Sequence, residues 1–207
     1  MSKLQYFLVS ALLLIANRVQ AVEPSFTPLP DLPDGRVVID ALSANGEVAV
    51  GPGFRWTREA GIAAFSGIAT DVSADDAVVV GYREAARPSS GIEAFRWTAE
   101  TGFIILDHLG AFNQSYAWGV SADGGMVVGE SGISSVAVRW STDGRVTPLV
   151  TGHAQAIAAS ADGSIVAGNA ISDLYSEAFR WSDGRNTLLG TLSGDLESLA
   201  RDMTPDG

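Results

Sequence analysis

The sequence predicts an all-β repeat protein made of β-propeller-like blades, each with about four short antiparallel strands, in an incomplete or open propeller. The phrase Glu-Ala-Phe-Arg-Trp recurs along the chain, and apolar runs closed by glycine alternate with Asp-Gly or Asn-Gly pairs. One tryptophan per copy recurs at intervals of 41, 43 and 41 residues: Trp56, Trp97, Trp140 and Trp181. A period of about 40 to 45 residues with many short strands is the length of one four-stranded blade.

The first 21 residues differ from the rest and predict a secretory signal peptide. Lys3 supplies a positive start, residues 6–16 form a nearly unbroken apolar run, and Val-Gln-Ala at residues 19–21 suits a cleavage site. The run is about 11 residues long, whereas a bilayer core needs about 20. We therefore expect an exported chain, periplasmic, on the cell surface or extracellular, without stable membrane insertion after cleavage.

The acidic composition excludes two classes of partner. Cleavage after Ala21 would remove Lys3 and Arg18, which leaves 11 basic residues against 24 acidic ones and a net charge of −13. Nucleic acids and anionic lipids require basic patches, so we expect neither as a partner. The chain has no cysteine, so its stability depends on its core rather than on disulfides.

The repeat domain covers residues 22–207 after the signal peptide of residues 1–21. It divides into four copies and a short fifth, approximately 37–67, 68–114, 115–155, 156–197 and 198–207. The fifth restates the opening of a repeat, which favours a fragment of a longer array over a closed ring.

Each copy begins with a segment that ends in Ser-Ala-Asp-Gly or a variant, followed by an apolar run such as residues 78–81. We interpret the Asp-Gly pair as a hairpin with a type I′ turn, in which both central residues have positive φ. Copy two has Asp76 where the others have glycine, and aspartate tolerates that conformation at some cost.

The Ala-Phe-Arg-Trp segment is the next predicted strand. Period-two alternation places Phe95 and Trp97 on one face and Ala94 and Arg96 on the other. A second turn and a last strand, such as residues 103–106, complete the copy. We interpret the tryptophans as core between blades; the alternative is a platform on which sugars stack.

An arginine precedes each repeat tryptophan. These arginines are Arg55, Arg96, Arg139 and Arg180. Four equivalent positions favour structural ion pairs over ligand sites, with the turn aspartates Asp123 and Asp162 as partners, because guanidinium holds a carboxylate in a fixed two-pronged geometry.

The connection between the glycine-closed run and the tryptophan strand varies in length between copies, and it is longest at residues 82–92. Insertions of this kind map to loops, where binding residues are often found. The candidate binding residues are Tyr82, Arg83, Arg87 and Tyr175. The ligand class is open, an extracellular or envelope protein or a glycan.

The phrases Val-Ser-Ala-Asp-Gly followed by Val-Val-Gly, then Glu-Ala-Phe-Arg-Trp-Thr, then the Leu-Gly element at residues 189–194 resemble the bacterial extracellular repeat of the HAF family. The resemblance covers about residues 37–207 and is clearest in copies two and four. Copy one is shortened, and copy three has Ala137-Val138 in place of Ala-Phe. The resemblance implies an exported bacterial repeat protein with a propeller-like fold and no established activity.

The sequence contains no recognisable catalytic, cofactor or metal motif. His108 and His153 lack metal-ligand spacing, and no serine has glycines two residues away on both sides. The favoured function is a non-enzymatic interaction or surface scaffold module. One alternative is a carbohydrate-active propeller enzyme, which predicts deep carboxylates with raised pKa values in a shared pocket. The other is a truncated fragment without independent function.

Overall fold

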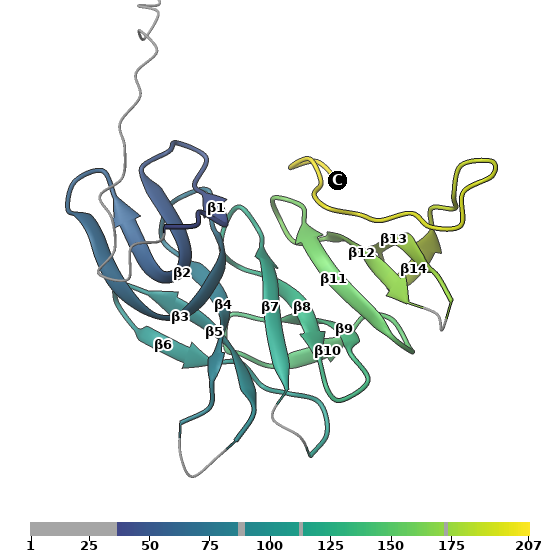
Figure 1. Cartoon of the computed structure of the whole chain (residues 1–207), viewed down its shortest axis with the longest axis horizontal. Helices are drawn as coiled ribbons and strands as arrows, with labels where there is room; N and C mark the ends of the chain where they lie inside the picture. Colours follow the sequence, from purple (N-terminus) through teal and green to yellow (C-terminus); the bar gives the residue numbers. More distant parts are fainter. Residues whose placement is uncertain (1–36, 87–89, 112–113, 172–173) are drawn as a thin grey trace, which may run out of the picture.

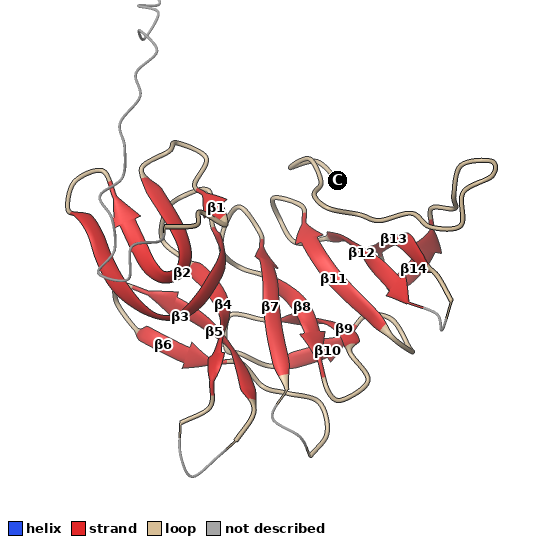
Figure 2. Ribbon diagram, viewed as in Figure 1, coloured by secondary structure: helices blue, strands red, loops and turns tan. Residues whose placement is uncertain are grey.

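The computed structural model describes residues 37–86, 90–111, 114–171 and 174–207, so the predicted signal peptide lies outside the described residues. All regular elements in these ranges are strands (Figure 2). No helix in the described part of the chain is long and apolar enough to span a membrane. The strands form three antiparallel sheets around a common centre without closing a ring (Figure 1). The predicted open β-propeller is confirmed.

Copies three and four are regular blades of four strands. Copy three contains β7 (Ser115–Val120), β8 (Val127–Ser131), β9 (Val136–Trp140) and β10 (Val146–Pro148). Copy four contains β11 (Ala154–Ala159), β12 (Ile165–Ile171), β13 (Ser176–Ser182) and β14 (Arg185–Leu188). In each sheet the first strand is the innermost, and successive strands are paired in chain order.

Copies one and two share a single six-stranded sheet. Its strands are β1 (Ala41–Leu42), β2 (Val48–Thr57), β3 (Gly61–Val72), β4 (Val79–Glu84), β5 (Ile92–Thr98) and β6 (Gly102–Ile105). In copy one the hairpin between the second and third repeat strands is replaced by Gly51-Pro52-Gly53, so β2 runs through both. Strand β3 then ends copy one and begins copy two. The shortened first copy therefore cannot form a separate blade.

Three hydrophobic clusters fill the spaces between neighbouring blades, and three of the four repeat tryptophans belong to them. Trp140 is fully buried among residues of copies two and three, and its indole N–H donates to the Asp107 carbonyl at 2.6 Å. Trp181 lies in the cluster between copies three and four, and Trp97 packs on the cluster between copies one and two. Trp56 in the shortened copy is only partly buried.

The glycine that closes each apolar run is required by close packing. A Cβ at Gly129 would overlap the Tyr116 carbonyl oxygen on the neighbouring strand, and Gly81 and Gly168 have the same environment. Any larger residue would force the innermost strand away from its partner.

The prediction of type I′ turns at the Ser-Ala-Asp-Gly sites is wrong. In copy three the Gly124 N–H donates to the Ser121 carbonyl at 2.9 Å, and only Gly124 in this segment has positive φ. This is a type I turn followed by a left-handed residue, within a four-residue loop that is closed by the Ser121 N–H donating to the Met126 carbonyl at 2.8 Å. A pair of residues with positive φ does occur at Asp183 and Gly184, between β13 and β14. Asp76 takes the left-handed conformation with φ of 67°, as expected.

The serine organises each of these turns. Ser121 Oγ donates to Asp123 Oδ1 at 2.6 Å and accepts the Met126 N–H at 2.9 Å, and the Gly125 N–H reaches the same carboxylate at 2.9 Å. The turns of copies one, two and four repeat these contacts. The serine hydroxyl and the backbone N–H lower the pKa of Asp123.

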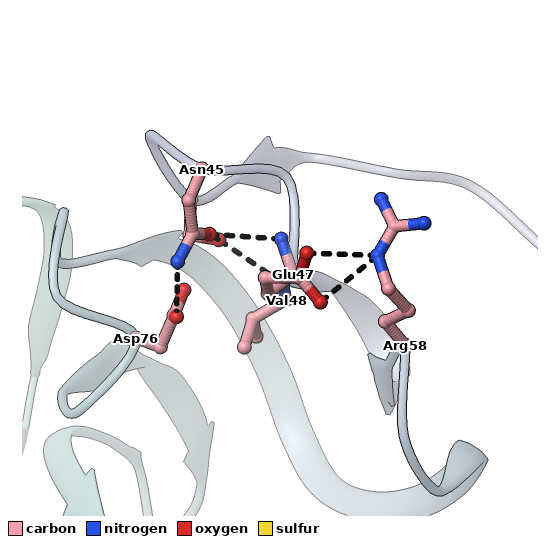
Figure 3. A network of polar contacts seen from close by, with 6 residues as sticks. Asn45, Glu47, Val48, Arg58 and Asp76 are labelled. Atoms are coloured by element: carbon pink, nitrogen blue, oxygen red, sulfur yellow. Dashed lines mark hydrogen bonds and ion pairs between the residues drawn. The ribbon is translucent and has the colours of Figure 1, made fainter. Parts of the chain in front are cut away.

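Neighbouring turns are also joined to one another. The Ala74 N–H donates to the Ala122 carbonyl at 3.1 Å, and the Ala161 N–H donates to the Pro205 carbonyl at 2.8 Å. Figure 3 shows the contact between the first two turns, where Asn45 Nδ2 donates to Asp76 Oδ2 at 2.6 Å. We call this end of the propeller the turn end.

The predicted ion pairs of the repeat arginines with Asp123 and Asp162 are not found. Among the described residues the ion pairs are Arg58–Glu47 and Arg145–Asp143. The guanidinium of Arg139 instead lies 4.9 Å from the ring centroid of Trp181 in the next blade, as Arg55 lies 5.3 Å from Trp97. Arg96 donates to the Gly124 carbonyl at 3.4 Å, and Arg180 donates to Ser182 Oγ in its own strand at 2.7 Å. Cation–π contact is compatible with a half-buried site in which a second charge would be costly to desolvate.

Candidate functional site at the mouth of the central channel

The innermost strands of the first four copies line the central space of the open propeller, which we call the central channel and which has two differently lined stretches. The stretch near the turn end, which we call the channel waist, has a cavity volume of about 350 Å³. Most residues lining the waist are small or apolar: Leu42, Ala44, Asp71, Val72, Ala74, Val120, Ala122, Ala159, Ala161, Asp202, Met203 and Pro205. Every copy contributes equivalent positions, which are the residues directly before and after the turn serine or threonine.

The other stretch, which we call the channel mouth, is a cavity of about 290 Å³. Residues from four copies line the mouth: Asp40, Ile68, Thr70, Tyr82, Trp118 and Ile157. Asp40, Thr70, Trp118 and Ile157 hold equivalent positions, three residues before the turn serine.

A β-bulge in each of copies two, three and four aims three of these residues into the mouth. The strand register shifts between Ala69 and Asp71, between Ala117 and Gly119, and between Ala156 and Ala158. The extra residues are Thr70, Trp118 and Ile157. Bulges commonly redirect side chains at functional positions, and here the same device brings one side chain per blade to the same cavity.

Three aromatic side chains form a cluster at the mouth. The rings of Tyr116 and Trp118 are parallel within 3°, with centroids 5.7 Å apart. Tyr82 stands edge-on to both, at 5.0 Å from Tyr116 and 5.5 Å from Trp118. All three rings are only partly buried and lie outside the three interblade clusters. They form a preformed apolar wall, which is typical of binding sites.

A buried carboxylate holds Trp118 in place. Glu130, only 6% exposed, accepts the Trp118 indole N–H at 3.2 Å and the Gln155 amide N–H at 3.1 Å. This network joins copies three and four beside the mouth. It fixes the orientation of Trp118, so the aromatic wall does not need to be ordered when a ligand binds.

The charged group that lines the mouth is the carboxylate of Asp40. Partial burial raises its pKa, and its backbone N–H is paired with the Val50 carbonyl at 2.9 Å. Arg201 occupies the equivalent position of the fifth copy but is exposed and does not line the cavity. The mouth therefore combines aromatic and aliphatic walls with one negative charge.

Asp71 is a deep carboxylate in the waist. Burial raises its pKa to about 6, and Asp202 adds a like charge in the same direction. Its two oxygens accept the Val72 and Val120 N–H groups, each at 2.8 Å. These contacts tie copy two to copy three, so Asp71 has a structural role whatever else it does.

The candidate binding residues predicted from the sequence lie in different parts of the structure. Tyr82 and Arg83 lie on β4 rather than in a loop, because that strand continues to Glu84. Tyr82 faces the mouth, whereas the Arg83 guanidinium lies 5.1 Å from the Phe103 ring centroid. Tyr175 lines another cavity of about 450 Å³ beside β13 and β14. Arg87 lies outside the described residues.

Sequence reasoning missed Asp40, Thr70, Trp118 and Ile157. A comparison of the copies could have identified them. The position three residues before the turn serine holds an acid in copy one, a hydroxyl in copy two, an indole in copy three and an aliphatic chain in copy four. A repeat position that changes chemistry while its neighbours do not is a candidate for a functional role. The bulge that directs it inward could not be inferred from strand alternation.

No protein-family model and no curated protein matches this chain. Solved structures do match it, among them two TolB-type proteins. A TolB-type protein from Agrobacterium tumefaciens matches with a TM-score of 0.54 and 19% identity, over 74% of this chain and 62% of that one. TolB from Acinetobacter baumannii matches with a TM-score of 0.53 and 13% identity, over 72% of this chain and 42% of that one. This chain therefore spans less than two thirds of either relative, and at such identities the likeness shows the β-propeller fold.

Proposed function

We propose that this protein is an exported, non-enzymatic interaction module that binds an envelope or extracellular partner at the channel mouth. The observation that carries the proposal is the cluster of Tyr82, Tyr116 and Trp118 beside a cavity that four copies build together. The repeat tryptophans Trp97, Trp140 and Trp181 are used in the core, whereas these rings are not. Export is supported by the signal peptide predicted for residues 1–21 and by the resemblance to HAF repeats.

Site-specific photo-crosslinking in the host tests this proposal. A photoreactive phenylalanine analogue at Tyr82 should give a discrete adduct in the envelope or medium fraction. The same analogue at Thr147, exposed on the outer strand β10, is the matched control and should give none. Equal crosslinking at both positions, or none at Tyr82, would contradict the proposal. The intact mass of the recovered protein would also show whether residues 1–21 are removed.

A second candidate, a carbohydrate-active enzyme, is favoured by one observation. Asp71 and Asp202 line the same cavity, and Asp71 has a raised pKa. This is the arrangement expected of an acid catalyst with a second carboxylate. The backbone N–H groups on both Asp71 oxygens favour a structural role instead. Hydrolysis of a glycan by the purified chain, abolished by Asp202→Asn but not by Asp183→Asn, would establish the enzyme.

A further inference from the structure

We infer that the channel mouth binds an organic cation with an apolar stem, namely the arginine or lysine side chain of an extended segment of the partner. This inference rests on the proposed function, because it names the chemistry recognised at the same site. It is carried by the juxtaposition of Asp40 with Tyr82, Trp118, Ile68 and Ile157 around one cavity.

The lining matches both parts of such a side chain. Ile68, Ile157 and the ring of Trp118 offer apolar surface for the methylene stem, which long basic side chains bury readily. The aromatic rings attract a cation through their negative faces, and Asp40 supplies a full negative charge at the same cavity. A volume of about 290 Å³ accommodates one long side chain rather than a folded element.

The charge of the chain favours a cation over an anion. It carries 24 acidic residues against 13 basic ones, and its one lysine is Lys3. Glu130 adds a second carboxylate behind Trp118. An anionic ligand would meet like charge at the mouth, whereas a cation would be attracted over a distance of about 8 to 10 Å at ordinary ionic strength.

A neutral glycan is the rival occupant, because sugars also stack on aromatic rings. Two of the polar groups near the mouth that could bind sugar hydroxyls are already hydrogen-bonded within the protein: Glu130 accepts from Trp118 and Gln155, and the Thr70 hydroxyl donates to the Ala117 carbonyl at 2.8 Å. Asp40 is the charged side chain of the lining, and its carboxylate can pair with a cationic ligand. A single carboxylate among apolar walls suits a cationic head group better than a ring of hydroxyls.

The test follows the Trp118 indole N–H by NMR while small probes are added to the full chain. The probes are Nα-acetylarginine methylamide, its neutral isostere Nα-acetylcitrulline methylamide, and methyl β-glucoside, with Trp118→Phe used to assign the signal. We expect saturable shifts with the arginine probe, binding at least about 3-fold weaker with citrulline, and no shift with the glucoside. Asp40→Asn should weaken arginine binding about 3- to 5-fold, whereas the exposed control Asp183→Asn should leave it unchanged.

Equal binding of arginine and citrulline probes, a shift with the glucoside alone, or an unaltered affinity in Asp40→Asn would each overturn the inference. Because crosslinking at Tyr82 reports any partner at the mouth, a positive crosslink with no cation selectivity would refute the ligand class and leave the proposed function standing. A negative crosslink would refute the proposed function itself.

Discussion

The two ends of the central channel are built from the same repeat, but the residue types at equivalent positions are similar between copies at one end and different at the other. At the turn end each copy repeats the hydroxyl, the carboxylate or amide, and the left-handed residue of one turn, and successive turns bond to each other. At the mouth the equivalent positions carry Asp40, Thr70, Trp118 and Ile157. The repeated end holds the blades together, and the varied end is free to specialise in binding.

The largest expected effect separates core aromatics from mouth aromatics. Trp140→Ala removes a fully buried ring and its bond to the Asp107 carbonyl, so we expect it to lower the free energy of unfolding by about 3 to 5 kcal/mol. Trp118→Ala removes an equal ring that is only partly buried and should cost less than half as much. Urea unfolding of both variants measures the difference. Equal losses of unfolding free energy would mean that the aromatic cluster at the mouth is part of the hydrophobic core.

The turn end is expected to be intolerant of a single added methyl group. Gly163 has φ of 69°, and its added Cβ would lie 2.5 Å from the Met126 Cβ in the preceding blade. Gly163→Ala should therefore cost about 2 to 4 kcal/mol from backbone strain and overpacking together. Gly184 has φ of 74° with open space around it, so Gly184→Ala should cost only the strain, about 1 kcal/mol. Similar midpoints for the two variants in thermal unfolding would contradict the contact between turns.

Asp71 should make the waist sensitive to pH. The folded chain keeps this carboxyl protonated up to about pH 6, whereas the unfolded chain releases the proton near its usual value of 3.8. The folded state then binds more protons between these values, so the contribution to stability falls as pH rises from about 4 to 6, by at most about 3 kcal/mol. A ¹³C NMR titration of the Asp71 carboxyl measures the midpoint directly.

Two variants sharpen the pH result. Asp202→Asn removes a like charge and should lower the Asp71 midpoint, whereas Asp183→Asn on the outer hairpin should not. A wild-type midpoint near 4 would show that the hydrogen bonds from the Val72 and Val120 N–H groups lower the pKa of Asp71 as much as burial raises it.

A small effect on stability is expected from the arginine that joins copies three and four. Arg139→Ala removes the stacking of the guanidinium on Trp181 and should cost about 1 kcal/mol. Arg145, whose ion pair with Asp143 is exposed, is the control and should change the unfolding midpoint very little when replaced by alanine. If Arg145→Ala costs as much, the contact between Arg139 and Trp181 adds no more stability than an exposed ion pair within one turn.

Much of the fold could be predicted from local sequence. The four strands of copies three and four, the glycine at the end of each apolar run, and the left-handed Asp76 all follow from alternation and backbone sterics. The fused strand β2 could not be foreseen in the same way. Its Gly51-Pro52-Gly53 segment reads as a turn, but Pro52 pairs with Ile68 across the sheet.

The candidate site was harder to predict because it depends on contacts between copies. Tyr82 was identified for its place in a long connection, although its role at the mouth comes from Tyr116 and Trp118 in the next blade. Carboxylate partners are expected for the repeat arginines from the sequence, but Arg55 and Arg139 lie over tryptophan rings of the next copy. Sequence spacing within one copy carries no information about which faces of two copies meet.

The division between the two ends is tested most directly by measuring stability and ligand binding on the same pair of variants. Ser121→Ala removes the hydroxyl that organises a turn, and Asp40→Asn alters the mouth. We expect Ser121→Ala to lower the free energy of unfolding by about 1 to 3 kcal/mol and to leave the affinity for Nα-acetylarginine methylamide unchanged in the folded fraction. We expect Asp40→Asn to change stability by under about 0.5 kcal/mol and to weaken that affinity. If both variants affect both quantities to the same extent, the two ends do not divide stability from binding.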